Sequence, residues 1–509
     1  MIQDINLRIA PEAAADRWLI RKAIAAQLKT DPREIHDYKI LRRSADARQR
    51  VVMLNLQVRV ATGTDSCVVA DFKPVALPTV APGSQPVVIV GAGPAGLFAA
   101  LRALECGMKP IVLERGKNVD DRRLDIASLN RTRTIDPESN YCFGEGGAGA
   151  FSDGKLFTRS KKRGDVRKVL SLLHQFGASE DVLIDSHPHI GSDKLPQVIK
   201  NIRTAIIEHG GEVRFSTKVT GLLIEGDEVK GVATASGEEF EGPVILATGH
   251  SARDVYGFLH DQGVGLEAKG FAMGVRLEHP QHLIDRLQYH STAGRGEYLP
   301  PAEYSFTAQS DGRGVYSFCM CPGGVVVPAA SAPGEQVVNG MSASARAGHW
   351  ANSGMVVEIR PGDFPEYDKY GVFSLLHLQQ DLERKFYEES GDSLNAPAQK
   401  MTDFVDGRDS VNTLPSSYIP GLHPARIDKL LPPFISERLK DGFRQFNRRC
   451  PGFLSRQAQL IGLESRTSSP VRIPRNPETL CHSSIKRLYP AGEGAGYAGG
   501  IVSAAIDGM

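Results

Sequence analysis

The residue spacing with the clearest chemical meaning is the run Gly91-Ala-Gly93-Pro-Ala-Gly96. Gly91 permits a tight turn, Gly93 lets the backbone approach a pyrophosphate closely, and Gly96 lets a helix pack against a strand. The run follows the apolar stretch 86–90 and precedes the helical stretch 97–104. A helix N-terminus placed there would face the phosphates with its free N–H groups. We therefore predict a dinucleotide site at this turn.

An acidic residue at the end of the next apolar stretch supports this interpretation. The stretch 110–113 ends at Glu114, and Gly107 provides a C-terminal cap for the helix before it. Glu114 follows Gly91 by roughly 20 residues, the distance at which a carboxylate reaches the adenosine ribose hydroxyls. The alternative is an exposed acid at a strand end. Arg115, the next residue, belongs to the predicted site as well.

Two distant glycine turns favour FAD over NAD. The stretch 242–249 predicts a buried strand that ends at Thr248 and Gly249, and the stretch 488–500 carries Glu493 into a turn before a final helix. The second turn could hold the ribityl chain and the pyrophosphate from the other side. Together with the first turn, these segments resemble the glutathione-reductase-like class of FAD proteins. We predict FAD as the cofactor, while a solvated loop carboxylate stays the alternative for Glu493.

The segment 136–156 carries a closer resemblance. Its sequence is Asp136-Pro-Glu-Ser-Asn-Tyr-Cys-Phe-Gly144-Glu-Gly-Gly-Ala-Gly-Ala-Phe-Ser152-Asp-Gly-Lys155-Leu, which is similar to the signature of a bacterial family of FAD-dependent proteins named NAD(FAD)-utilising dehydrogenases. Supporting segments are 187–191, 249–254, 316–324 and 464–472. The resemblance covers essentially the whole chain and implies a dehydrogenase or reductase.

The glycines of this segment could contact a phosphate or the flavin edge, with a hydroxyl from Ser152. Lys155 could stabilise the anionic reduced flavin, or it could only begin the solvated basic run 159–163. The complete predicted FAD site comprises Gly91, Gly93, Pro94, Ala95, Gly96, Glu114, Arg115, Gly146, Gly147, Ser152, Gly154, Lys155, Val219, Thr248, Gly249, Gly492, Glu493, Gly499, Gly500 and Ile501.

Four further residues are weaker candidates for chemistry. Cys319 and Cys321 share one side of an extended segment and could form a redox dithiol beside the flavin. Their spacing differs from the Cys-x-x-Cys of flavin disulfide reductases, so packed, buried thiols are the favoured interpretation. His250 and Arg466 could face the flavin or an anionic substrate, although isolated residues of these types are more often structural.

The elements that must position these residues predict an α/β protein with three domains. Residues 1–75 are typical of a small ferredoxin-like α+β accessory domain, and a linker follows at 76–85. A Rossmann-like FAD-binding domain begins at 86–269 and returns at 404–509, with a mixed α+β cap or substrate domain inserted at 270–403. The predicted elements of the first domain are strand 2–8, helix 11–28 and strands 38–43 and 51–60.

Composition and charge restrict the partners. Sixty basic and 59 acidic residues give a net charge of +1, so no whole-molecule field would gather nucleic acid or an anionic membrane. The longest uncharged stretch, 84–101, is broken by glycines and cannot be a membrane span. Seven scattered cysteines and a charged N-terminus predict a cytoplasmic protein without an export signal. His187 and His189 lack a third ligand, so no metal is predicted.

The substrate cannot be read from the sequence, and two alternatives stay open. One is an FAD monooxygenase of the hydroxylase type, and the other is an FAD-binding RNA-associated or regulatory protein. NAD(P)H or a protein could donate electrons. No second glycine-rich βαβ unit is predicted, so we expect NAD(P)H to be a poor reductant on its own. In related flavoproteins the helix after the C-terminal glycine turn, here 488–500, is longer, so we also expect the chain to continue beyond Met509.

Overall fold

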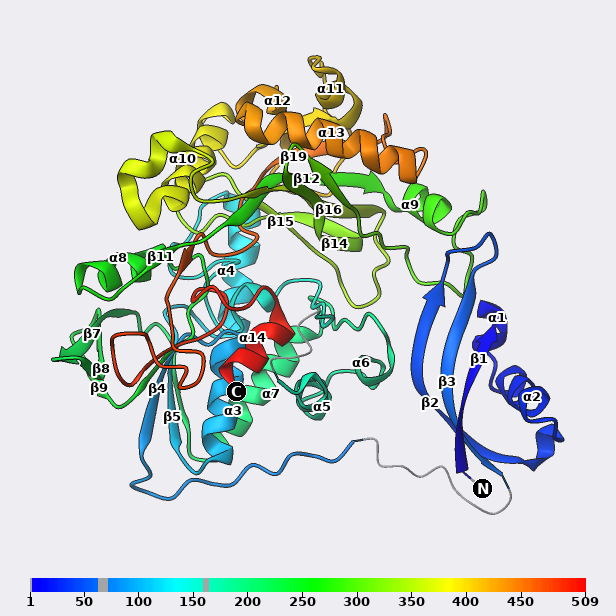
Figure 1. Ribbon diagram of the computed structural model, residues 1–509, viewed down its shortest axis with the longest axis horizontal. Helices are drawn as coiled ribbons and strands as arrows, with labels where there is room; N and C mark the ends of the chain where they lie inside the picture. Colours follow the sequence, from blue (N-terminus) through cyan, green and yellow to red (C-terminus); the bar gives the residue numbers. More distant parts are fainter. Residues whose placement is uncertain (1, 63–71, 159–163) are drawn as a thin grey trace.

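A computed structural model of the 509-residue chain describes residues 2–62, 72–158 and 164–509 (Figure 1). It confirms the predicted α/β class. A small N-terminal domain lies to one side, a parallel sheet with its helices forms the FAD-binding domain, and a large, mostly antiparallel sheet lies over it. In the described part of the chain, no helix has the length and apolar character needed to cross a bilayer.

The N-terminal domain is an antiparallel sheet with the strand order β1-β3-β2. Its element order, strand-helix-strand-strand, corresponds to the first part of a ferredoxin-like unit. The prediction of one helix over 11–28 is wrong, because Asp16 Oδ1 accepts bonds from Trp18 N and Leu19 N and starts a new helix there. The elements are β1 (Ile2–Ile9), α1 (Pro11–Ala14), α2 (Arg17–Leu28), η1 (Pro32–Glu34), β2 (Ile35–Asp46) and β3 (Met53–Thr62).

The FAD-binding domain is built on a parallel sheet with the order β21-β10-β4-β5-β6. β4 lies at its centre, where Val88 pairs with Val244 on one side and Ile111 on the other. The elements are β4 (Pro86–Val90), α3 (Pro94–Glu105), β5 (Lys109–Leu113), α4 (Val119–Thr132), η2 (Gly147–Gly149), α5 (Val166–Gln175), α6 (Asp181–Ile184), α7 (Leu195–Glu208), β6 (Glu212–Arg214), β10 (Val244–Leu246), α8 (Arg253–Asp261), β21 (Leu488–Pro490) and α14 (Ile501–Gly508).

Each face of this parallel sheet is covered. Helices α3, α5, α7 and α14 contribute to one apolar core, and α8 and the strands β7 (Val219–Glu225), β8 (Glu228–Thr234) and β9 (Glu239–Glu241) contribute to the other. The three strands form their own antiparallel sheet. This covering explains why the strand stretches read as continuous apolar runs.

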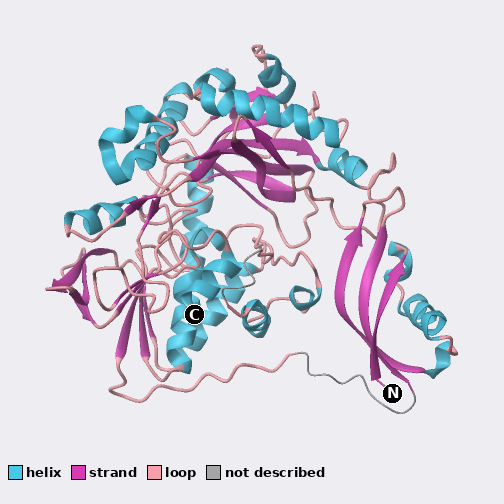
Figure 2. Cartoon of the chain, viewed as in Figure 1, coloured by secondary structure: helices cyan, strands magenta, loops and turns pink. Residues whose placement is uncertain are grey.

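The cap domain is a mostly antiparallel sheet, in which only β17 and β18 of the described strands pair parallel, with helices on its outer face (Figure 2). The strand order is β13-β14-β16-β12-β19-β17-β18, and β15 pairs with β14. The elements are β12 (Phe271–Pro280), α9 (Gln281–Gln288), β13 (Thr307–Ser310), β14 (Arg313–Pro328), β15 (Val338–Met341), β16 (Trp350–Ile359), η3 (Pro365–Phe373), α10 (Ser374–Glu389), β17 (Ala396–Lys400), α11 (Met401–Asp406), β18 (Leu422–Pro424), α12 (Ile427–Leu430), α13 (Pro433–Arg449) and β19 (Gln459–Glu464).

This sheet extends the cap beyond the predicted boundary at residue 403. β19 pairs with β12 and with β17, so the chain stays in the cap sheet until Glu464. The chain enters the cap after β11 (Glu267–Ala268) and leaves it before β20 (Val471–Arg472), and these two strands pair with each other. The predicted return at 404 is therefore placed too early. A long-range strand pairing decides this boundary, and no local pattern signals it.

Candidate functional site

The turn after β4 leads into a helix whose N-terminus has no side-chain cap. Gly91 has a φ of +105°, and a Cβ at Gly96 would lie 1.9 Å from Gly91 O, so both positions need glycine. A Cβ at Gly93 would meet only the Gly147 Cα, at 4.0 Å. Protein atoms thus leave open space in front of Gly93. The turn offers free N–H donors and room to a phosphate.

Glu114 ties the turn to the neighbouring loops. Its Oε2 accepts a bond from Ala92 N at 2.9 Å, and its Oε1 accepts bonds from Gly116 N at 2.9 Å and Gly144 N at 3.0 Å. The residue is only 5% exposed, so the alternative of an exposed acid at a strand end is wrong. Glu114 lines the same cavity as Gly93. Its bond to the ribose hydroxyls stays a prediction.

The loop that begins at Gly144 is held by Arg122 of α4, which is completely buried. Its Nε donates to Asn140 O and its Nη2 to Tyr141 O, each at 2.9 Å, and its Nη1 donates to Glu145 O at 2.7 Å. Burial lowers the pKa of Arg122 to about 10. The sequence analysis missed this residue, because α4 carries many charges and gives no sign that one of them is buried.

A second helix N-terminus faces the first one. α14 begins at Ile501, and again no side chain caps its first turn. A Cβ built on Gly499 or Gly500 would meet nothing within 4 Å, so open space lies in front of both. The preceding turn is tied to the parallel sheet by Gly494 N, which donates to Thr248 O at 3.1 Å. Four separate segments therefore converge on one space.

A cavity of about 370 Å³ lies between these segments. Two uncapped helix N-termini and a glycine-rich wall fit the pyrophosphate of FAD. The lining residues come from both the FAD-binding domain and the cap, which fits an extended dinucleotide. The predicted residues that line the cavity are Gly91, Gly93, Pro94, Ala95, Glu114, Arg115, Gly147, Ser152, Gly154, Lys155, Val219, Thr248, Gly249, Glu493, Gly499, Gly500 and Ile501. Their contacts with FAD stay predictions.

Three predicted residues do not line the cavity. Gly96 packs against Gly91, and a Cβ at Gly492 would lie 2.9 Å from the Ala95 Cβ. Gly146 N donates to the carbonyl of the first turn, and a Cβ there would clash with α7. These glycines bring backbone segments together behind the cavity.

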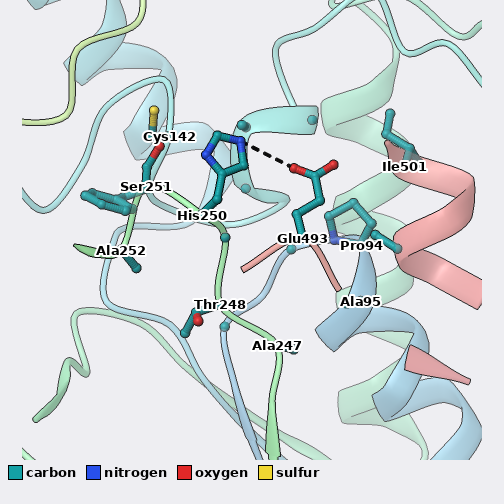
Figure 3. A pocket seen from close by; sticks show the side chains of 18 of the residues that line it. Pro94, Ala95, Cys142, Ala247, Thr248, His250, Ser251, Ala252, Glu493 and Ile501 are labelled. Carbon is teal, nitrogen blue, oxygen red and sulfur yellow. Dashed lines mark ion pairs between the residues drawn. The ribbon is translucent and has the colours of Figure 1, made fainter. Parts of the chain in front are cut away.

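Glu493 and His250 lie beside the cavity, next to Pro94 and Thr248 (Figure 3). His250 Nε2 lies 3.7 Å from Glu493 Oε2. Burial, helped by nearby arginines, lowers the pKa of His250 to about 3, so the imidazole is neutral. Burial also raises the pKa of Glu493 to about 7. The contact therefore joins a neutral ring to a carboxyl group that titrates near neutral pH, and the exposed fraction of the Glu493 side chain, 29%, faces the cavity.

Arg466 also borders the cavity, but its guanidinium is committed to protein groups. Nε donates to Glu383 Oε1 at 3.1 Å, and Nη2 donates to Glu335 Oε2 at 2.6 Å. Nη1 donates to Ser331 Oγ at 2.6 Å and to Ser251 Oγ at 3.1 Å. All three nitrogens thus have protein acceptors, and the geometry favours the structural alternative for Arg466.

The thiol pair occupies the cap end of the cavity. Cys319 lines it, whereas Cys321 is fully buried behind it. Lys155 lines the cavity and places its Nζ 3.2 Å from Asp153 Oδ2. Burial acts against the charge of Lys155, but the two thiols and Asp153 outweigh it and raise its pKa. The basic run 159–163, proposed above as the alternative context of Lys155, lies outside the described residues.

Several lining residues were not predicted. Phe143 lies under the Arg115 guanidinium at 4.3 Å, and Phe318 and Asn339 come from the cap strands. Phe143 belongs to the conspicuous segment 136–156, so its position was a signal that could have identified it. Phe318 lies in the supporting segment 316–324, which was a similar signal. Asn339 had no comparable signal, because the strand pairing that brings it to the cavity is not local.

Comparisons with known proteins follow the same division into domains. Residues 86–124 match an FAD binding domain, and residues 270–467 match the family "FAD-dependent protein, C-terminal domain-like". Residues 1–61 match a domain of unknown function. The match over residues 270–467 ends close to the point where the chain leaves the cap sheet.

An uncharacterized protein of Clostridium beijerinckii is 38% identical over 527 residues, which cover 100% of this chain and 97% of that protein. Solved structures are more distant. A geranylgeranyl bacteriochlorophyll reductase-like protein from Thermoplasma acidophilum is 14% identical, with coverage of 84% and 77% of the two chains and a TM-score of 0.35. CtdE in complex with FAD is 12% identical, with coverage of 84% and 82% and a TM-score of 0.32.

Proposed function

Since this chain belongs to the same family as the Clostridium beijerinckii protein and FAD is its cofactor, we propose that it is an oxidoreductase of the dehydrogenase or reductase type. It acts on a small molecule by hydride transfer. One observation carries this proposal: the cavity that begins at Gly93 continues to the cap strands, where Phe318 and Asn339 form its wall. A substrate enclosed there would lie against the cofactor.

When bound, FAD supplies two-electron hydride chemistry at its N5 atom. The N-termini of α3 and α14 hold the pyrophosphate with their free N–H groups. The ammonium group of Lys155 places a positive charge at the cap end, where it stabilises negative charge. Phe318 covers that end with an apolar ring, which limits the access of water.

Proton transfer is assigned to Glu493. Its carboxyl group has a pKa raised to about 7 by burial, so it can both hold and release a proton at Oε1 or Oε2 near neutral pH. His250 has a pKa lowered to about 3 and does not compete for that proton. The imidazole lies 3.7 Å from the carboxyl group, in the contact drawn in Figure 3.

The electron donor is a second part of the proposal. Within the described ranges, the parallel sheet carries one GxGxxG turn between a strand and a helix, and Glu114 is the residue predicted for the ribose of the dinucleotide bound there. We therefore propose that NAD(P)H reduces the isolated protein poorly unless a protein partner or closure around the substrate completes a nicotinamide site. The family name NAD(FAD)-utilising dehydrogenase implies the opposite, which makes the donor worth testing first.

The test is an anaerobic screen of donors and acceptors that follows the bleaching of the flavin. We expect a small-molecule reductant to bleach it and NADH and NADPH to act slowly in stopped-flow mixing. Full bleaching by either nicotinamide within about 0.1 s would contradict the donor proposal. A flavin that is reduced by NAD(P)H and then consumes oxygen with substrate would favour the monooxygenase alternative. Copurified RNA would favour the RNA-associated one.

A further inference from the structure

The cap strand that reaches the cavity is distorted at the thiol pair. In the β14 to β16 pairing, Phe318 lies opposite Gly354 and Cys321 lies opposite Asn352, so two residues of β14 face one residue of β16. Cys319 is in this bulge and has a φ of +46°, in the left-handed region that side chains other than glycine rarely adopt. Bulges of this kind redirect a side chain, and they concentrate near active sites.

Two positive side chains from different domains surround the pair. Arg276 of β12 donates through Nη2 to Cys319 O at 2.7 Å and lies 3.4 Å from the Cys321 Sγ. Lys155, from the glycine-rich loop, places its Nζ 3.7 Å from the same sulfur. Carboxylates accompany both cations, Asp153 at 3.2 Å from Lys155 and Glu464 at 3.3 Å from Arg276. Cations at these distances stabilise a thiolate, whereas a cysteine that only packs among apolar side chains has no such neighbours.

This environment shifts the pKa values of the two thiols in opposite directions. The hydrogen bond between the thiols, and then the charges of Lys155 and Arg276, hold the pKa of Cys319 well below its usual value. The same hydrogen bond and burial raise the pKa of Cys321, since a second thiolate would repel the first. The pair therefore favours a state with one thiolate beside one protonated thiol.

The position of Cys319 points the thiolate toward the flavin end of the cofactor. Arg115 and Val219 line the cavity close to Glu114, whose carbonyl accepts a bond from Thr217 N, and both helix N-termini line the cavity as well. A dinucleotide with its adenosine at Glu114 and its pyrophosphate at Gly93 extends its flavin toward the cap. Cys319 is in that cap wall.

We propose that Cys319 and Cys321 form a redox-active dithiol that exchanges an electron pair with the flavin. In the oxidising direction, the Cys321 S–H bond breaks and an S–S bond forms between the two Sγ atoms. The electron pair and the proton pass to oxidised FAD, which becomes the reduced flavin anion. The reverse step uses the reduced flavin to open the disulfide. This proposal rests on the proposed FAD-dependent function but adds a second redox centre to it.

Flavin disulfide reductases place their Cys-x-x-Cys in the helix after the first glycine turn, whereas this pair lies in a cap strand. In the present chain that helix is followed only by Cys106, at its C-terminal cap. Cys106 is exposed and distant from the cavity lining, so it provides a matched control.

The first experiment is an anaerobic reductive titration of the FAD-loaded protein after mild oxidation with diamide. We expect four electrons per FAD for the wild type and for Cys106→Ser, and two electrons for Cys319→Ser and for Cys321→Ser. Peptide mass spectrometry should find the Cys319–Cys321 disulfide in the oxidised wild type. A wild type that holds FAD, accepts only two electrons and forms no such disulfide overturns the dithiol but leaves the FAD-dependent function intact. A protein without FAD contradicts the function itself.

The second experiment needs no turnover. The rate of alkylation of Cys319 by iodoacetamide, measured against pH, reports the thiolate in both the FAD-loaded and the FAD-free protein. We expect Lys155→Met to move the pH profile of alkylation upward by about one pKa unit, which is about a tenfold slower rate on the acidic limb of the profile. An unchanged pH profile in a folded Lys155→Met variant would contradict the assigned role of the ammonium group.

Discussion

The two ends of the cofactor cavity are built in different ways. The pyrophosphate end uses backbone groups of glycine turns, chiefly the continuous segment from β4 through α3 to β5, with open space in front of Gly93. The cap end uses side chains from distant positions, among them Lys155, Cys319 and Asn339. Backbone recognition of a phosphate requires glycine at fixed spacing, whereas side-chain recognition requires only that distant strands pair correctly. The first end can therefore be recognised locally and the second cannot.

The largest expected effect separates the two ends. Replacing Gly93 with valine should leave a folded protein that loses FAD, because the protein has room for the side chain and the cofactor does not. We expect FAD to bind at least about 1000-fold more weakly, or about 4 kcal/mol. Flavin absorbance after gel filtration and calorimetric titration of the FAD-free protein measure this loss.

The control for Gly93→Val is Gly257→Ala in α8. Gly257 is helical, and an added Cβ would meet nothing within 4 Å, so the variant should retain FAD and gain slightly in stability. Normal FAD content in a folded Gly93→Val variant would show that the pyrophosphate lies elsewhere.

The next effect concerns how the cap is held in place. Glu383 of α10 is completely buried and accepts bonds from Arg253 Nη2 at 2.7 Å and Arg466 Nη2 at 3.0 Å. Burial alone would raise the pKa of Glu383, but the two arginines outweigh it and lower the pKa to about 2. Glu383→Ala leaves both guanidinium groups without this partner, so we expect a loss of about 3–5 kcal/mol in the free energy of unfolding.

Denaturant unfolding measures that loss, and Glu437→Ala is the control. The Glu437 side chain is 65% exposed and pairs with Lys440 in α13, which also lies 3.8 Å from Asp428. Removal of the Glu437 side chain should therefore change the free energy of unfolding by less than about 1 kcal/mol. Equal losses in the two variants would mean that the buried charges do not couple the cap to the FAD-binding domain.

The same contrast explains what the sequence could predict. Gly91, Gly93 and Glu114 were identified because their spacing follows from local geometry, and the α/β class followed from the strand, turn and helix order. The cap boundary was placed too early because β19 joins the sheet by long-range pairing. Arg466 and the thiol pair could be named as residues. Their roles depend on partners such as Glu335 and Lys155, which lie more than 100 residues away along the chain.

The smallest expected effect is the pH dependence that Glu493 contributes. Its pKa is raised from 4.5 to about 7 in the folded protein, so the folded state binds its proton more tightly than the unfolded state does. The stabilisation from the protonated form is complete below about pH 4.5 and is lost as the pH rises through about 7. Glu493→Gln has no such proton to lose. The free energy of unfolding of the wild type should therefore fall relative to Glu493→Gln by on the order of 1–3 kcal/mol between pH 5 and pH 8.

Thermal unfolding of both FAD-loaded proteins across this range measures the difference, and Glu478→Gln in an exposed loop should show none. A constant difference between wild type and Glu493→Gln would mean that the carboxyl group is already charged at pH 5, and it could not then hold a proton for the flavin at neutral pH.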